Sequence, residues 1–146
     1  MTKHQSPRDF VAASGSDISE KEAEFAVEFL GGQEERYNIE VTVAGIGGYL
    51  KVTINMDVNG RSWFFEGNAG ATTLVAVGKY WGHCYTKDVG RLTKDSRGFN
   101  INAVSIFPAG YVNVNFFDGS SNFLGHAHAG GLTNLTCTGG GTGSWR

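Results

Sequence analysis

The sequence predicts an all-β domain, with eight or nine short strands arranged as a sandwich or a closed barrel and one short N-terminal amphipathic helix. Through most of the chain, apolar residues alternate with polar ones, which is the period of a strand with one buried face. The composition agrees, because 22 glycines against two prolines among 146 residues suit many tight turns. A chain of this length buries one core, so we expect a single domain.

The N-terminal part of the chain has a different character. Residues 1–16 are polar and rich in serine, which predicts a flexible arm. Ser19 and Glu22 fit a capping box, in which a hydroxyl and a carboxylate accept hydrogen bonds from free amides at a helix start. The apolar stripe of the predicted helix consists of Ala23, Phe25, Ala26, Val27, Phe29 and Leu30, and Gly31-Gly32 ends it. Residues 17–146 then form one domain that carries this helix.

The strand pattern is clearest in the hairpin over residues 111–130. Val112, Val114 and Phe116 alternate with polar neighbours before a turn at residues 118–122. Asn59-Gly60 predicts another hairpin, because a type I′ turn needs positive φ at both central positions. We expect strands over residues 37–43, 50–58, 61–67, 71–77, 79–86, 97–107, 111–117, 123–129 and 132–138. The glycine-rich tail has the composition of a linker, but the Trp145 side chain is expected to pack into the domain and hold the tail in place.

Charge and composition argue against several classes of function. The 12 basic and 14 acidic residues are spread along the chain, so there is no basic stripe for nucleic acid and no polybasic run for an anionic membrane. No apolar stretch approaches the length of a membrane span, and the N-terminus lacks the apolar centre of a signal peptide. As written, the chain is expected to be soluble, monomeric and cytoplasmic. Cys84 and Cys137 form no C-x-x-C pair; two buried, inert thiols are expected, and a disulfide between them is the alternative.

Four segments are similar to a known family. Residues 78–88, 112–118, 123–126 and 139–145 resemble, in the same order, the core of the Vap family, the virulence-associated proteins of Rhodococcus. The resemblance covers roughly residues 35–145. It implies a compact, closed antiparallel β-barrel of about eight strands with a helix packed against it. It also implies secreted proteins without known enzymatic activity that help a bacterium survive in macrophages by disturbing the endolysosomal compartment, with lipid contacts as one candidate cause.

The chain departs from the family pattern in two places. Family members carry a secretion signal and a variable leader, whereas this chain opens with a polar arm and a helix of its own. Ala127 stands at a position associated with a bulky side chain in the family, and it is flanked by Gly125 and Ala129. If these small residues face inward, the barrel is expected to be hollow where its relatives are filled.

Two histidines form the first candidate site. His126 and His128 are two residues apart on a strand, so both side chains lie on one face. If Phe117 pairs with Phe123 in a regular ladder, both imidazoles face inward with the apolar set, and a slip of one residue turns both to solvent. A metal site needs a third ligand, and the sequence offers only scattered candidates such as His83. We therefore expect surface histidines and no metal ion.

Trp81, His83 and Tyr85 form the second candidate site, and Lys79 continues their row along the same strand face. One interpretation is an aromatic wall that holds a hydrophobic small molecule, because such pockets are mostly apolar with a few directed polar groups. The alternative is that Trp81 and Tyr85 simply fill the core. No catalytic residue can be assigned, because the chain contains no nucleophile elbow, zinc-protease pair or phosphate loop. No cofactor is indicated.

Three functions remain compatible with these patterns. The first is a non-enzymatic, Vap-like barrel that acts by surface contact with a host protein or a lipid surface, and it rests on the motif resemblance. The second is a small-molecule binding barrel, or a cofactor-free cyclase or isomerase that holds a hydrophobic biosynthetic intermediate near its reactive shape in an internal aromatic pocket. The third is a structural module without a ligand.

Overall fold

The computed structural model describes residues 34–71, 75–106, 108–133 and 135–146. The predicted N-terminal arm, the predicted helix and the boundary between residues 16 and 17 lie outside the described residues. In chain order the elements are β1 (Glu35–Ile46), β2 (Tyr49–Val58), β3 (Arg61–Ala71), β4 (Val75–Thr86), α3 (Val89–Asp95), β5 (Gly98–Ile106), β6 (Ala109–Phe117), β7 (Phe123–Gly131) and β8 (Cys137–Trp145).

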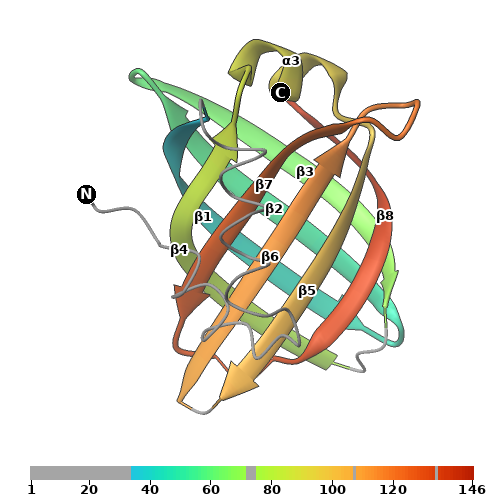
Figure 1. The fold of residues 1–146 in the computed structure, drawn as a ribbon. Coiled ribbons are helices and arrows are strands. Elements are labelled where there is room, and N and C mark those ends of the chain that lie inside the picture. The colour runs from blue at the N-terminus through green and yellow to red at the C-terminus, as the bar shows by residue number, and fades with distance from the viewer. Residues whose placement is uncertain (1–33, 72–74, 107, 134) are drawn as a thin grey trace, which may run out of the picture.

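The eight strands form one closed barrel in the order β1-β2-β3-β8-β5-β6-β7-β4, and β4 pairs back onto β1. Every neighbouring pair is antiparallel. The short helix α3 lies over one end of the barrel, near the C-terminus (Figure 1), and buries Leu92 completely. The fold is thus the all-β closed barrel of eight strands that the family resemblance implied.

Two hairpin turns have the predicted chemistry. Asn59 and Gly60 both have positive φ, at 52° and 88°, as the type I′ turn requires. At the other turn, the Asp118 carboxylate accepts hydrogen bonds from the backbone amides of Ser120 and Asn122, at 2.9 and 2.8 Å. Asp118 is therefore part of the turn that the sequence predicted over residues 118–122.

Two predicted strands and one helix differ between the sequence prediction and the structure. The strand expected over residues 71–77 is wrong, because β3 continues to Ala71 and β4 begins at Val75. The last strand is not 132–138 but β8, which takes in the glycine tail. Glycine is required there, since a Cβ on Gly141 would collide with the backbone carbonyl oxygen of Asn68 on β3. The helix α3 was not predicted at all.

Four aromatic rings form the centre of the core near the α3 end. The Phe65 ring centroid lies 5.5 Å from that of Phe99, 5.2 Å from that of Phe116 and 5.2 Å from that of Trp145. These separations are typical of packed aromatic pairs. Trp145 is buried, so its side chain anchors β8 as predicted.

The expectation of a hollow barrel at Ala127 is wrong. Gly125, Ala127 and Ala129 do face inward, and Ala127 lies between Cys84 and Val114 in the sheet. A cavity that admitted water would leave exposed surface on its lining, whereas Ala127 is 1% exposed and both neighbours are 0% exposed. The surrounding side chains therefore leave no water-sized space against Ala127.

Candidate functional site

The two histidines of β7 face outward because of a β-bulge. Phe117 pairs with Phe123, but the next pair is Phe116 with Gly125, so Leu124 is an extra residue on β7. The imidazoles consequently lie on the same face as the asparagines of β6, with Asn115 opposite His126. The bulge supplies the one-residue slip that turns both side chains away from the core.

The predicted row on β4 also lies outside the barrel. Tyr80 and Cys84 are completely buried, so the alternate residues Lys79, Trp81, His83 and Tyr85 point outward. The row therefore neither lines an internal pocket nor fills the barrel interior. Lys79 forms an ion pair with Glu40 at 2.9 Å, and Trp81 is 57% exposed opposite Gly130.

Four of the six candidate residues come together. His83 lies opposite His128 across β4 and β7, and Tyr85 lies opposite His126. The rings of Tyr85 and His126 are stacked, with centroids 5.2 Å apart and planes 13° apart. His126 Nδ1 lies 2.6 Å from His128 Nε2. Lys79 and Trp81 are further along β4, towards the opposite end of the barrel.

Glu34 completes this cluster and could not be found from the sequence. Its Oε1 lies 3.2 Å from His126 Nε2, and the two side chains are only 5% and 12% exposed. No local pattern could have linked two residues 92 positions apart. Burial, and then the charge of His126, lower the pKa of His128 well below the usual imidazole value. His128 is therefore held in its neutral form.

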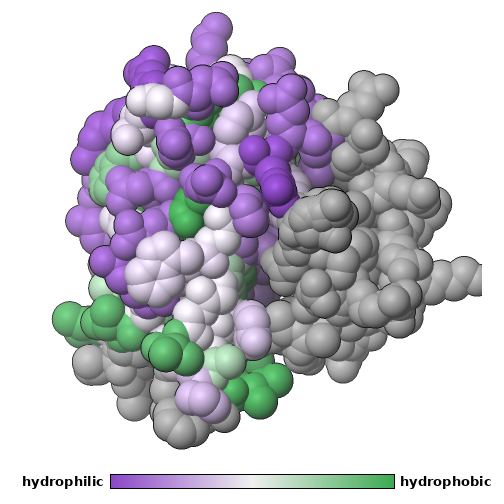
Figure 2. Space-filling view, turned by 90° about the vertical axis from the view of Figure 1, so that its left-hand side faces the viewer, coloured by the Kyte–Doolittle hydropathy of each residue, from purple (hydrophilic) through white to green (hydrophobic). Residues whose placement is uncertain are grey.

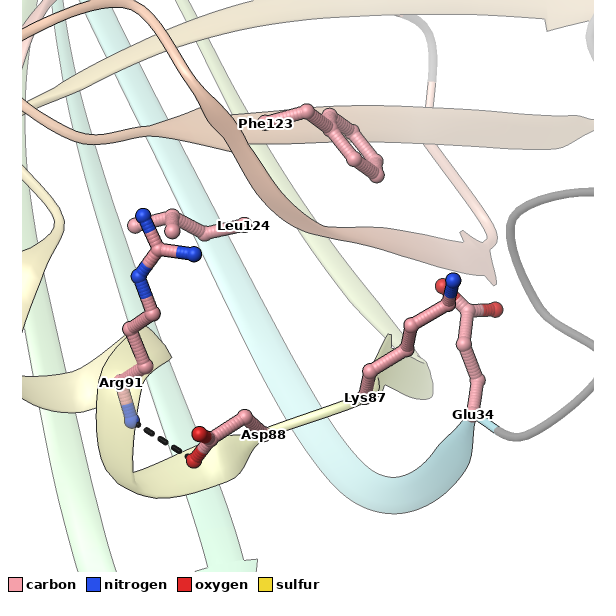
Figure 3. A pocket seen from close by; sticks show the side chains of 6 residues that line it. All are labelled: Glu34, Lys87, Asp88, Arg91, Phe123 and Leu124. Atoms are coloured by element: carbon pink, nitrogen blue, oxygen red, sulfur yellow. Dashed lines mark hydrogen bonds between the residues drawn. The ribbon is translucent and has the colours of Figure 1, made fainter.

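A pocket of about 230 Å³ lies beside the cluster, where α3 begins (Figure 3). It is lined by Glu34, Lys87, Asp88, Arg91, Phe123 and Leu124. Several polar groups in its wall are already engaged: Asp88 Oδ1 accepts a hydrogen bond from the Arg91 backbone amide at 3.0 Å, and the Arg91 guanidinium pairs with Asp118 at 3.0 Å. The pocket is smaller than the range of about 300–1,000 Å³ typical of drug-sized ligands.

Two kinds of feature are absent from the residues that the structure describes. Within the described ranges, no group of three or more histidine, cysteine, aspartate or glutamate side chains is placed to hold a metal ion. Nor do these ranges contain a helix that is long and apolar enough to span a bilayer.

Exposed apolar side chains gather at the end of the barrel opposite α3, which we call the apolar end. The β1–β2 and β5–β6 turns lie there, and so does the point where β7 ends. Figure 2 shows hydrophobic side chains projecting from this lower end. The apolar end consists of Ile46 (70% exposed), Tyr49 (51%), Val77 (72%), Ile106 (57%) and Leu132 (85%). These exposed fractions are large for apolar residues that gather in one place.

Comparisons with known proteins agree on one family. A family model described as Rhodococcus equi virulence-associated protein matches residues 1–146. The solved structure of the virulence-associated protein VapB from the intracellular pathogen Rhodococcus equi is 37% identical, with a TM-score of 0.68, and the match covers 78% of this chain and 98% of VapB. VapD from the same organism is 29% identical, with a TM-score of 0.72 over 78% of this chain and 99% of VapD. No curated protein sequence matched the chain. The chain thus belongs to the Rhodococcus equi virulence-associated protein family.

Proposed function

We propose that this protein acts without catalysis, by contact between the apolar end of its barrel and a membrane surface. The observation that carries the proposal is the gathering of Ile46, Tyr49, Val77, Ile106 and Leu132, all more than half exposed, at one end of the barrel. These residues come from four strands, β1, β2, β4 and β5, and from the segment after β7. A virulence role of this kind requires secretion, as the family resemblance implies.

Burial of apolar surface would drive the contact. Transferring one fully exposed valine, leucine or isoleucine side chain out of water contributes about 1.5–3 kcal/mol. Four such side chains at partial exposure are enough for reversible attachment, comparable to a single lipid anchor, but not for permanent insertion. Tyr49 suits the same surface because an aromatic ring with a polar tip favours the boundary between headgroups and acyl chains.

Electrostatic attraction would contribute little. Among the described residues, the two lysines nearest the apolar end are neutralised by neighbours on the barrel wall: Lys51 pairs with Glu66 at 2.7 Å and Lys79 pairs with Glu40 at 2.9 Å. The contact is therefore expected to tolerate salt and to occur on zwitterionic as well as anionic lipid. A protein partner recognised through charge would show the opposite behaviour.

Vesicle flotation tests the proposal. Purified protein should float with phosphatidylcholine vesicles, and the double variant Val77→Thr, Leu132→Ser should bind at least about tenfold more weakly, since about 1.4 kcal/mol is a factor of ten. Phe123→Ser is the matched control, because Phe123 is also partly exposed but lies at the α3 end. Equal binding by the double variant and the wild type, or no binding by either, would overturn the proposal.

The internal-pocket alternative has less support. It depends on Trp81, His83 and Tyr85 lining the inside of the barrel, and these side chains point outward. A cyclase or isomerase would also need space for its substrate, whereas the interior around Ala127 is filled. The internal pocket is therefore the weaker candidate function.

A further inference from the structure

Glu34, His126 and His128 are linked in one chain of hydrogen bonds on the outside of the barrel. The two contacts are Glu34 Oε1 to His126 Nε2, at 3.2 Å, and His126 Nδ1 to His128 Nε2, at 2.6 Å. Strand β4 lies between β1 and β7 in the barrel, so the chain of bonds passes over β4, where Tyr85 stacks on His126. These three side chains therefore fasten the residue that enters β1 to β7. We call them the histidine latch.

The number of protons in the latch is limited by its geometry. The contact between the two imidazoles needs one nitrogen that donates and one that accepts, so only one proton fits between His126 Nδ1 and His128 Nε2. When His126 Nε2 also carries a proton, it donates to the Glu34 carboxylate. This is the one extra proton that the closed latch can hold, because a charged His126 donates to both the Glu34 carboxylate and a neutral His128. Two charged imidazoles would point N–H at N–H across 2.6 Å.

The described surroundings of the imidazole pair come from three neighbouring strands and from the pocket beside Glu34. The neighbours from β4 are His83 and Tyr85, and Arg36 of β1 lies opposite Tyr85. Strand β6 contributes Asn113 and Asn115, which are uncharged. Lys87 lines the pocket beside Glu34 (Figure 3). Among these described neighbours, Glu34 is the acidic group that contacts the imidazole pair.

The sign of the pH effect follows from burial. The pKa of His128 is lowered in the folded protein, first by desolvation and then by His126. An opened latch would therefore take up protons more readily than the closed one, starting near the ordinary imidazole pKa of about 6.5. The free energy that favours the closed latch over the open one therefore has its full value above a pH of about 6.5. It decreases as the pH falls below that point.

We propose that Glu34, His126 and His128 form an acid-released latch, which holds the start of β1 against the outer face of β4 and β7 at neutral pH and opens at mildly acidic pH. Opening frees the Glu34 carboxylate and exposes the stacked ring of Tyr85. The barrel itself persists, because the core side chains do not titrate in this range. The latch lies at the α3 end, so its behaviour is independent of the apolar end and of the vesicle experiment.

Amide hydrogen exchange on the full chain tests the latch. After correction for the intrinsic pH dependence of exchange, lowering the pH from 7.5 to 5.5 should speed exchange at Arg36 and around His126 at least about tenfold relative to the core of β2. His128→Gln removes the second titrating ring and should abolish this acid response. His83→Gln is the matched control, because it removes a neighbouring imidazole outside the contacts between Glu34, His126 and His128, and it should keep the response. An equal acid response in His128→Gln and wild type, or none in wild type, would overturn the proposal.

Ring-nitrogen NMR of the wild-type protein gives a second readout that needs no variant. The histidine signals should show the His128 ring becoming charged in the same pH range in which the start of β1 loses protection. Both rings fully charged while Arg36 stays protected would rule the latch out, even if His128→Gln fails to fold.

Discussion

Phe117 lies directly opposite Phe123 across β6 and β7, with ring centroids 6.0 Å apart, yet the residue before it pairs two positions further along β7. Leu124 is the extra residue. The bulge shifts the rest of β7 by one position, so that His126 and His128 join the outer face rather than the core. One inserted residue thus creates the histidine cluster, because a regular ladder from the same Phe117–Phe123 pair would have buried both imidazoles.

Gly141 and Gly140 form a matched pair for testing why β8 is rich in glycine. A Cβ on Gly141 would collide with the Asn68 carbonyl oxygen, whereas a Cβ on Gly140 would meet its nearest atom, the Phe99 carbonyl oxygen, at an ordinary 3.5 Å. Gly141→Ala should therefore lower the free energy of unfolding by about 1–3 kcal/mol, the usual cost of overpacking. Gly140→Ala should be neutral or slightly stabilising. Urea unfolding measures both, and similar losses from the two variants would contradict the close pairing of β8 with β3.

Phe65 and Phe64 are adjacent in the chain but differ in burial. Phe65 is completely buried and contacts three other aromatic rings, whereas Phe64 faces outward beneath the Arg146 guanidinium. Phe65→Ala should reduce the free energy of unfolding by about 3–5 kcal/mol through the cavity that it leaves. Phe64→Ala should cost less than about 1 kcal/mol. A smaller loss for Phe65→Ala than for Phe64→Ala in urea unfolding would show that the inward face has been assigned wrongly.

Much of the fold could be predicted because most strands carry their pattern in their side chains. Alternation located the middle of β1, β2 and β6, and Asn59-Gly60 fixed one hairpin through its positive φ angles. The pattern failed where side chains are absent, because β8 is largely glycine and has no hydropathic period to detect. It also missed α3, whose seven residues are too few for a helical repeat, although Asp88 does cap the helix start.

The candidate site was predicted in its residues but not in its placement. His83, Tyr85, His126 and His128 were all selected from the sequence, and the barrel brings them together. Which face they occupy depends on the register of β7. A bulge changes that register but cannot be detected in the alternation of apolar and polar residues. Glu34 was missed because its contact with His126 depends on barrel closure, which places β4 between β1 and β7.

Cys84 and Cys137 should be unreactive while the protein is folded. Both are free and buried, and burial raises the pKa of each thiol, with the charge of Glu34 adding to the effect at Cys84. Since the thiolate is the reactive form, alkylation at pH 8 should be at least about a hundredfold slower than for a free thiol. Both thiols should react at once in urea, which serves as the control. Fast modification of Cys84 in native buffer would mean that the β4–β7 region opens readily.

Asp118 should make the hairpin between β6 and β7 sensitive to acid. The backbone and side-chain hydrogen bonds from Asn122 lower the pKa of the Asp118 carboxyl, with further contributions from the Ser120 amide and the charge of Arg91. A lowered pKa means that the stabilising effect is present above the ordinary carboxyl pKa of about 3.9 and is lost as the pH falls through the folded value. Asp118→Asn should therefore unfold at a lower urea concentration than wild type at pH 7, and the difference should shrink steadily between pH 5 and pH 2. A difference that stays constant over this range would show that the carboxylate acts through its shape alone and not through its charge.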